Sequence, residues 1–266
     1  MDETAQVPGT ADPVVQRLRA AGCVFAEDEA ALLRAAADGD PDRLDGLVGR
    51  RAGGEPLEQV VGWAEFCGLR IAVEPGVFVP RRRTGSLVRQ AVPMAAPGDV
   101  VVDLCCGSGA LGAALTAAVP GVELHAADVD GAAVRCARRN LAAAGGRVVQ
   151  GDLFQPLPPA LRGRVVVLLA NVPYVPTDEL ALLPPEARDH EPRTALDGGD
   201  DGLHLLRRVA AGARDWLAPS GSVLVESSER QAPVALAVLR GVGLLPRLAE
   251  DDDLGATVVI GTAPAG

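Results

Sequence analysis

The sequence predicts a doubly wound α/β domain with a seven-stranded, mostly parallel sheet, preceded by a small helical domain and a β-hairpin linker. Three observations point to this fold class. Apolar strands alternate with helical stretches from residue 99 onward, helical periodicity alone fills the N-terminal part, and a stretch rich in β-branched and aromatic residues lies between the two. Near-continuous apolar strands separated by helices are typical of a parallel sheet that is covered on both faces.

The expected domain boundaries follow these changes in pattern. We expect the helical domain at residues 1–58, because apolar residues recur there at helical spacing between glycines that interrupt the pattern. This spacing predicts two or three short helices. Residues 59–82 predict the hairpin linker, because β-branched and aromatic residues alternate with others around Gly68 and the Pro75-Gly76 turn. The α/β domain then takes residues 83–266.

Within the α/β domain, each predicted strand is short and apolar and is followed by a helical stretch. Residues 232–262 add one more helix and two more strands, and ligands of such sheets bind beyond the carboxyl ends of the strands. The five earlier strands are expected at 100–104 (VVVDL), 122–127 (VELHAA), 147–150 (RVVQ), 165–170 (VVVLLA) and 222–227 (SVLVES), with helices at 110–119, 131–144 and 202–217.

The composition is that of a packed, water-soluble protein, with 48% apolar and 23% charged residues. A net charge of −10 disfavours nucleic acid as a partner, because phosphate backbones are bound by basic surfaces. The acidic start MDETAQVPGT lacks the pattern of a signal peptide, and no apolar run is long enough to span a bilayer. We therefore expect a cytoplasmic protein without membrane contact.

The cysteines and histidines do not predict a metal site. Five cysteines are scattered without CxxC spacing, which favours reduced thiols over disulfides or zinc ligands. His125, His190 and His204 are also scattered, and we expect them to face solvent or to cap helices.

A glycine-rich loop follows the first strand of the α/β domain, in DLCCGSGALG (Asp103 to Gly112). Glycines at 107 and 109 allow a tight turn and a close approach of the backbone to a ligand. The three glycines also satisfy the G-x-G-x-x-G spacing of dinucleotide-binding loops, so they do not choose the cofactor by themselves. Asp103 discriminates better, because it would repel a pyrophosphate and suits the positively charged methionine moiety of S-adenosylmethionine. Cys105 and Cys106 are expected to pack at the loop rather than to act as nucleophiles.

Two further acids follow the next two strands. Asp128 lies about 20 residues beyond the loop, where an acidic residue accepts hydrogen bonds from ribose hydroxyls in nucleotide-binding folds. Asp152 is placed to accept a hydrogen bond from an adenine amino group while Leu153 packs on the ring. Taken singly, Asp128 and Asp152 are also explained as helix caps or turn formers. All three acids in order with the glycine loop predict that S-adenosylmethionine is the cofactor.

The tetrapeptide Asn171 to Tyr174, NVPY, ends the fourth strand and predicts the acceptor site. The Asn171 side-chain oxygen and the Val172 main-chain oxygen are two acceptors that can hold both hydrogens of a planar NH2 group. Pro173 restricts Val172 to an extended conformation and so aims its carbonyl, and Tyr174 can pack against the planar group. The alternative is a plain turn after a buried strand.

Four motifs in order resemble the protein-(glutamine-N5) methyltransferases of the HemK/PrmC type. They are GEPLEQVVGWAEFCGLRIAVEPGVFVPR (54–81), DLCCGSGALG, NVPY, and HEPRTALDGGDDGL (190–203). The resemblance implies a class I S-adenosylmethionine-dependent methyltransferase fold and methylation of the Gly-Gly-Gln glutamine of class I peptide-chain release factors, docked on the N-terminal helices. With the residues above, it makes Asn171, Val172, Pro173 and Tyr174 the candidate catalytic residues. The candidate cofactor-binding residues are Asp103, Cys105, Cys106, Gly107, Ser108, Gly109, Asp128, Val129, Asp152, Leu153 and Asn171.

The chain departs from the pattern of this family at three positions. Valine replaces proline at 172, which should preserve the chemistry because the acceptor there is the main-chain carbonyl. Arg83 and Gly85 stand near positions where the family carries acidic residues, so we expect the methionine end of the cofactor or the substrate entrance to differ. We interpret these departures as those of a paralogue branch of the family. Alternative methyl acceptors are therefore a different protein, a small-molecule amide or amine, or a nucleobase amino group. Glu226, after the fifth strand, is a further candidate to reach the cleft.

Overall fold

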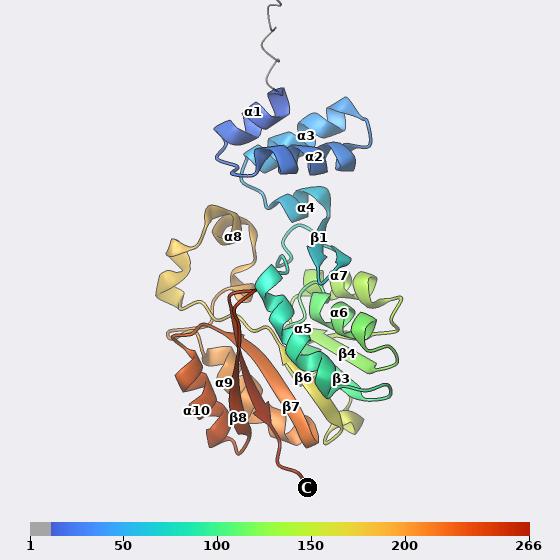
Figure 1. The fold of residues 1–266 in the computed structure, drawn as a ribbon, viewed down its shortest axis with the longest axis vertical. Coiled ribbons are helices and arrows are strands. Elements are labelled where there is room, and N and C mark those ends of the chain that lie inside the picture. Colours follow the sequence, from blue (N-terminus) through green and yellow to red (C-terminus); the bar gives the residue numbers. More distant parts are fainter. Residues whose placement is uncertain (1–11) are drawn as a thin grey trace, which may run out of the picture. The chain divides into compact units, whose positions relative to one another are not determined.

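The computed structural model describes residues 12–266, and the chain divides into two compact units, residues 1–61 and 62–266 (Figure 1). The first unit is helical, and its described helices are α1 (Pro13–Ala20), α2 (Ala26–Ala37), α3 (Pro41–Ala52) and α4 (Leu57–Val61). Asp12 and Asp40 cap α1 and α3 with their carboxylates, and a proline follows each cap, where its fixed φ suits the first helical turn.

The core of the first unit lies between these short helices. It contains Leu18, Leu33, Leu47 and Val60, together with a buried ion pair in which Arg51 Nε lies 2.7 Å from a Glu29 carboxylate oxygen. Two or three helices were expected up to residue 53, and three are present. The domain boundary needs a correction, because residues 59–61 continue α4 as a helix instead of starting the hairpin; the first eleven residues of the predicted domain lie outside the described residues.

The second unit opens with the expected hairpin, which is shorter than predicted. Strands β1 (Trp63–Phe66) and β2 (Leu69–Ala72) pair antiparallel, so that Trp63 lies opposite Ala72. The hairpin is part of this unit by its contacts. It is followed by the 3-10 turn η1 (Arg82–Thr84), helix α5 (Gly85–Ala91) and the 3-10 turn η2 (Val92–Met94).

A seven-stranded sheet with the order β5-β4-β3-β6-β7-β9-β8 forms the centre of the second unit, as predicted. Strands β3 to β7 are parallel, and β9 is antiparallel to both of its neighbours. The strands are β3 (Val100–Leu104), β4 (Glu123–Asp128), β5 (Arg147–Gln150), β6 (Val165–Ala170), β7 (Leu217–Ser227), β8 (Leu245–Asp251) and β9 (Ala256–Thr262).

Helices cover both faces of the sheet because alternate strand residues are apolar on each face. Val101 and Leu169 pack on the side of α5, α6 and α7, whereas Val102 and Leu168 pack on the side of α9 and α10 (Figure 1). No helix within residues 12–266 has the length and apolar character needed to cross a membrane. The remaining elements are α6 (Ala110–Ala118), α7 (Gly131–Leu141), η3 (Pro159–Leu161), η4 (Thr177–Leu182), α8 (Pro185–His190), η5 (Arg193–Ala195), α9 (His204–Trp216) and α10 (Ala232–Gly241).

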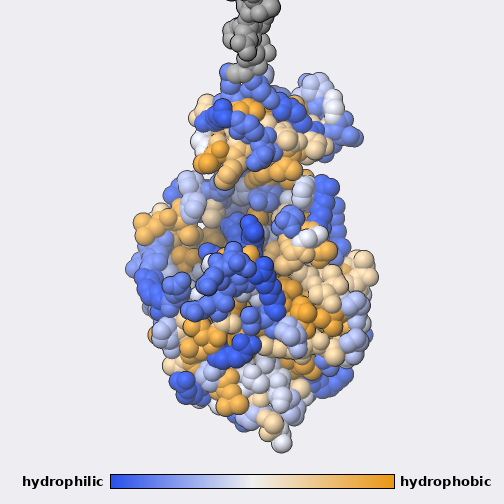
Figure 2. All heavy atoms as spheres, in the orientation of Figure 1, coloured by the Kyte–Doolittle hydropathy of each residue, from blue (hydrophilic) through white to orange (hydrophobic). Residues whose placement is uncertain are grey.

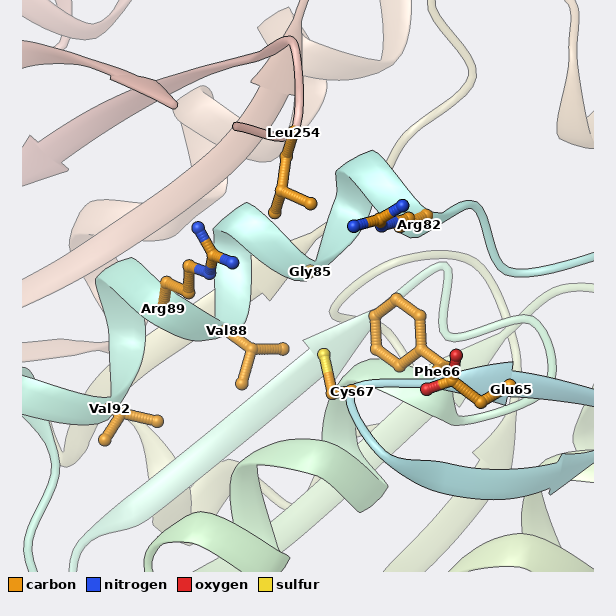
Figure 3. Close-up of a pocket in the computed structure, with 9 residues that line it drawn as sticks. All are labelled: Glu65, Phe66, Cys67, Arg82, Gly85, Val88, Arg89, Val92 and Leu254. Carbon is orange, nitrogen blue, oxygen red and sulfur yellow. The ribbon is translucent and has the colours of Figure 1, made fainter. Parts of the chain in front are cut away.

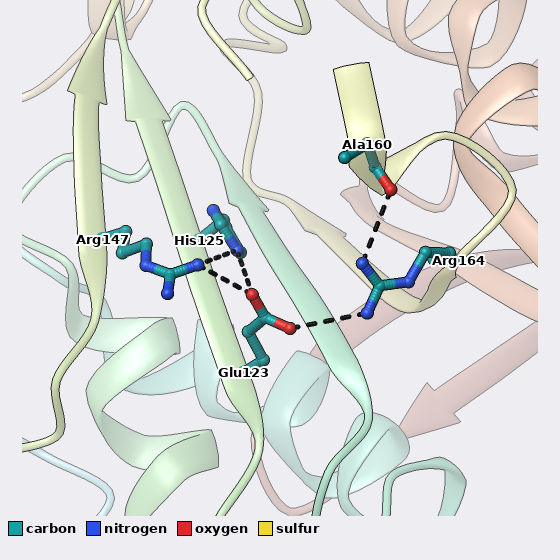
Figure 4. Close-up of polar contacts among 5 residues, drawn as sticks. All are labelled: Glu123, His125, Arg147, Ala160 and Arg164. Atoms are coloured by element: carbon teal, nitrogen blue, oxygen red, sulfur yellow. Dashed lines mark hydrogen bonds and ion pairs between the residues drawn. The ribbon is translucent and has the colours of Figure 1, made fainter. Parts of the chain in front are cut away.

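His125 does not face solvent as predicted, because it is a buried residue of β4. Its Nε2 lies 3.1 Å from Glu123 Oε1, and Arg147 binds the same carboxylate at 2.8 Å (Figure 4). Arg164 Nη2 approaches the second carboxylate oxygen at 3.7 Å. Since Glu123 is the first residue of β4, this polar group lies at the amino ends of the strands and stabilises the sheet away from the predicted ligand edge.

Candidate active site

The register of the sheet places four of the polar or loop residues in one row at the carboxyl ends of the strands. Leu104 of β3 lies opposite Ala127 of β4 and Ala170 of β6, and Ala170 lies opposite Val225 of β7. The next residues of these four strands are therefore neighbours in the order Asp128, Cys105, Asn171, Glu226. This edge is where open α/β sheets bind their ligands.

The loop from Cys105 to Gly109 is held by hydrogen bonds to the end of β4. Gly107 N donates to an Asp128 carboxylate oxygen at 2.8 Å, and Cys106 N donates to Ala127 O at 3.1 Å. Gly109, with a φ of 78°, begins α6, and a Cβ there would come within 3.1 Å of the Ala137 Cβ. Only glycine fits this combination of left-handed backbone and close helix contact.

Asp128 is not the cap of the following helix. Asp130 is the N-cap of α7, where its side chain accepts from Ala132 N at 2.8 Å. The Asp128 carboxylate instead accepts from Gly107 N and from Asp130 N. Burial raises the pKa of this carboxyl, while those N–H donors oppose the shift. Asp128 is therefore not a helix cap, although its hydrogen bond from Asp130 N is the one that a turn-forming aspartate makes.

Asp103 is fully buried at the end of β3, beneath the start of α6. Its Oδ2 accepts from Gly112 N at 3.0 Å, and its Oδ1 has no hydrogen-bond partner within the described residues. Burial raises the pKa of Asp103 to about 7, and the nearby Asp128 charge acts in the same direction. A buried carboxylate with an unpartnered oxygen beside a glycine loop is typical of a site that binds a polar or cationic group.

This pKa predicts a pH-dependent cost of Asp103 to stability. Between about pH 4 and pH 7 the folded protein binds a proton at Asp103 that the unfolded chain has lost, so its contribution to stability falls as the pH rises. Compared with the native protein, Asp103→Asn is expected to gain roughly 2–3 kcal/mol in unfolding free energy between pH 5 and pH 8. Urea unfolding without cofactor at the two pH values measures this gain. Any effect of the substitution on packing is the same at both pH values and cancels when the two are compared. A difference in unfolding free energy between variant and native protein that does not change with pH would contradict the raised pKa of Asp103.

The residues after β5 and the two cysteines of the glycine loop also follow the carboxyl ends of their strands. Leu153 is buried with a φ of 49°, and Asp152 forms an ion pair of 2.6 Å with Arg208. Burial and the neighbouring carboxylates raise the pKa of both Cys105 and Cys106. Both thiols therefore stay protonated, which agrees with a packing role.

The segment Asn171 to Tyr174 is held by Gln231, which precedes α10, and its continuation at Val175 is held by the chain that precedes α9. Tyr174 O accepts from Gln231 Nε2 at 2.9 Å, and the next residue, Val175, exchanges backbone hydrogen bonds with Leu196 and Gly198. Gly202 has a φ of 73°, and a Cβ there would lie 2.2 Å from Tyr174 O, so a side chain is excluded. Gly202 of the motif HEPRTALDGGDDGL therefore allows the chain before α9 to approach the backbone of Tyr174.

Asn171 itself presents an unsatisfied acceptor at the edge. Its Oδ1 is buried and has no partner within the described residues, whereas Val172 is buried in the main core. A buried amide oxygen without a hydrogen bond is costly, and native structures keep few of them. Asn171 thus places a buried acceptor without a partner in the described residues beside Cys105 and Glu226 in the row.

Tyr174 is bound on both sides by charged residues. Its hydroxyl donates to Glu226 Oε1 at 3.1 Å and accepts from Arg83, which also donates from Nε to Glu226 at 2.9 Å. Burial and the Glu226 charge raise the pKa of Tyr174 to about 12, so the phenol stays neutral. Glu226 contacts Tyr174 and Arg83 at the end of β7, and its ion pair with Arg83 was not predicted.

Gly85 lines a cavity away from the row. The cavity has a volume of about 650 Å³ and is lined by both apolar and charged residues of the hairpin, the segment 82–92 and the turn between β8 and β9, including Phe66, Arg82 and Leu254 (Figure 3). A Cβ at Gly85 would already contact Cys67 Sγ at 3.2 Å. In the space-filling view, hydrophilic residues gather over the start of α5 and this turn (Figure 2), where Arg89 pairs with Asp251.

Comparison with known proteins decides the family. The Methyltransferase small domain family matches residues 68–179. The release factor glutamine methyltransferase of Geobacter sulfurreducens is 37% identical over 218 residues, which cover 81% of this chain and 76% of that protein. The chain belongs to the release factor glutamine methyltransferase family. It is therefore a methyltransferase, and its fold is the class I fold of S-adenosylmethionine-dependent methyltransferases.

Two further comparisons bear on the fold and on the breadth of this family. A methyltransferase from Pyrococcus furiosus superposes with a TM-score of 0.56 at 18% identity, covering 74% of this chain and 90% of that one, which supports the fold alone. The 4-amino-L-phenylalanine/4-methylamino-L-phenylalanine methyltransferase of Streptomyces pristinaespiralis is 36% identical over 210 residues, covering 76% of this chain and 71% of that protein. One protein named for a small-molecule acceptor is thus similar to this member of the release factor glutamine methyltransferase family.

One positioning residue of this family member escaped the sequence analysis. Asn140 of α7 donates from Nδ2 to Ser108 O at 2.8 Å and exchanges hydrogen bonds with the backbone of Ala72 in β2. It therefore ties the hairpin to the glycine loop. In the sequence it is one polar residue of an amphipathic helix, and no local signal distinguishes it from a solvent-facing residue.

Proposed function

We propose that this protein transfers a methyl group from S-adenosylmethionine to the side-chain amide nitrogen (N5) of a protein glutamine, the Gly-Gly-Gln glutamine of a class I release factor. The observation that carries the proposal is the buried, unpartnered Oδ1 of Asn171 in the row that also contains Asp128 and the glycine loop. The names of the similar proteins support the choice of acceptor.

The described residues fit the cofactor. Asp128 can accept from the ribose hydroxyls through lone pairs that its two N–H donors leave free, and Leu153 offers an apolar surface for the adenine ring. Asp103 Oδ1 supplies an unpartnered acceptor for the methionine end, directly or through water. The remaining proposed contacts are Cys105, Cys106, Gly107, Ser108, Gly109, Val129, Asp152 and Asn171. S-adenosylmethionine supplies an electrophilic methyl group on a positively charged sulfur.

The acceptor slot works by orientation. An amide nitrogen is a weak nucleophile because its lone pair is delocalised, so the slot must hold both hydrogens and direct the lone pair. Asn171 Oδ1 and the Val172 carbonyl accept one hydrogen each, and Pro173 keeps Val172 extended. These acceptors also stabilise the positive charge that develops on the nitrogen. Tyr174 stays neutral and closes the slot with its ring.

The helical unit is proposed to dock the protein substrate. Its surface carries exposed apolar side chains at Val24 and Phe25, which sit just before α2 and are 82% and 68% exposed. Exposed large apolar residues next to each other are typical of protein contact sites. The described helices of this unit share a hydrophobic core that contains Leu18, Leu33 and Leu47.

The proposal is tested by incubating the full-length protein with a class I release factor and S-adenosylmethionine labelled in its methyl group. Mass spectrometry of the peptide that contains Gly-Gly-Gln should show one added methyl group on the glutamine side chain. An unmodified Gly-Gly-Gln peptide, with enzyme shown to bind the cofactor, would count against the release factor as acceptor.

A second candidate function is methylation of a small amine or amide. Arg83 is the observation that favours it, since a half-exposed cation borders the acceptor slot and a relative is named for an amino acid substrate. A nucleobase is disfavoured by the net charge of −10.

The valine at position 172 gives a direct test of the main-chain role. Val172→Pro restores the tetrapeptide that the HemK/PrmC resemblance implies and is expected to keep kcat within about threefold of the native value, because the accepting carbonyl remains. Labelled-methyl transfer to the release factor measures it. A loss as large as that of an Asn171 variant would show that the slot depends on the valine side chain.

A further inference from the structure

Three residues from separate parts of the second unit form a charged cluster beside the acceptor slot. Arg83 comes from η1, Tyr174 follows β6, and Glu226 lies near the end of β7. Arg83 Nε donates to Glu226 Oε1 at 2.9 Å, and the Tyr174 hydroxyl joins both side chains. Because Glu226 neighbours Asn171 in the register of the sheet, the cluster borders the position of the acceptor nitrogen.

The two charges of this cluster are in very different surroundings. The Glu226 side chain is 4% exposed and therefore needs a compensating cation, which Arg83 provides. The Arg83 side chain is 50% exposed, and its hydrogen bonds in the described part of the chain use one N–H of Nε and one of Nη2. A guanidinium has five N–H donors in a planar fork. Arg83 therefore keeps donors for another partner while it neutralises Glu226.

A second observation also indicates a ligand at this position. The Oε2 of Glu226 is buried without a partner within the described residues, as is Oδ1 of Asn171. Two adjacent residues of the row thus hold unsatisfied acceptors, and Arg83 adds a partly exposed donor group. Acceptors for N–H groups next to a donor for an anion form a site for a molecule that carries both.

We infer that Arg83 binds a carboxylate of the acceptor, so that the enzyme also methylates small free amides or amines that carry a carboxylate in the same molecule as the NH2 group. This inference rests on the proposed methyl transfer at Asn171 and adds a substrate class to it. The guanidinium fork suits a carboxylate because two parallel N–H bonds can form, and such charged hydrogen bonds are stronger than neutral ones. Glu226 and Tyr174 hold the fork in place.

The experiment compares acceptors that differ by one charge. One pair is acetyl-Gly-Gly-Gln with a free carboxylate and the same peptide blocked as a C-terminal methylamide. The other is 4-aminophenylacetate and its methyl ester. For the native protein, kcat/KM is expected to be roughly tenfold or more higher for the charged member of each pair, mostly through KM. In Arg83→Gln this ratio should fall to about one, and Arg83→Lys should retain part of it.

A further variant separates recognition from folding. Arg83→Gln leaves Glu226 buried without a cation, so Arg83→Gln combined with Glu226→Gln removes the uncompensated charge. The preference should stay lost in the double variant. A native ratio of one, or a ratio that survives in the Arg83→Gln variants, would overturn the inference.

The release factor is assayed as an acceptor alongside the two pairs of small acceptors. Methylation of the release factor without methylation of any small acceptor overturns the inference and leaves the proposed function standing. Methylation of the charged small acceptors without the release factor supports the inference and overturns the release factor as substrate. If no acceptor is methylated, both fail.

Discussion

Asn171→Ala is expected to lower kcat for methyl transfer by roughly 100- to 1,000-fold, the usual effect of removing one oriented group that stabilises developing charge. The physical reason is the loss of one of the two acceptors for the NH2 hydrogens, so the nitrogen is no longer aligned and its developing charge is less stabilised. Because the Asn171 side chain is small and its Oδ1 has no partner within the described residues, the fold should persist. Single-turnover transfer of a labelled methyl group measures the effect.

A matched control for Asn171 lies in the same segment. The Thr177 hydroxyl donates to Asp197 at 2.6 Å on the exposed surface, and Thr177→Ala removes that bond without touching the row at the carboxyl edge. The control should transfer the methyl group at close to the native rate. Equal kcat for Asn171→Ala and the native protein would eliminate Asn171 from the reaction.

The second large effect is expected for cofactor affinity in Asp128→Ala. This change removes the proposed acceptor for two ribose hydroxyls and also the carboxylate that binds Gly107 N. Since each hydrogen bond to a charged group contributes ~1.5–3 kcal/mol, the Kd for S-adenosylmethionine should rise by about 100-fold or more. Calorimetric titration measures Kd.

Asp130 provides the control for this change. Asp130→Ser removes a carboxylate two residues away but keeps a side chain that can cap α7. Its Kd should stay close to the native value. If both variants weaken binding equally, the effect is a general one of charge or of helix stability, and the specific role of Asp128 is wrong.

The local patterns of the sequence predicted the strands of the parallel sheet and the polar residues at their carboxyl ends, but not α5 or α8. Asp103, Asp128 and Asn171 each stand at the end of an apolar strand, and parallel strands bring such ends together. One strand was predicted too short. The strand expected at 222–227 is β7, which begins at Leu217, and Leu217 lies opposite Val165 across an irregularity in the pairing.

The contacts that hold the site were not predictable, because they join residues far apart in the chain. Arg83 meets Glu226 across 143 positions, and Asn140 meets Ala72 across 68. Nothing local distinguishes these side chains from surface residues, so Arg83 was noticed only as a departure from a family pattern. Such pairings depend on the packing of η1 and the hairpin against the sheet, which periodicity does not specify.

The position of the added methyl group tests the central claim most directly. Fragmentation of the methylated product should place the methyl group on the side-chain nitrogen of the glutamine in Gly-Gly-Gln when the native protein is used, and should find almost none with Asn171→Ala. A methyl group on any other atom, or the same yield from both proteins, would contradict the proposed amide slot.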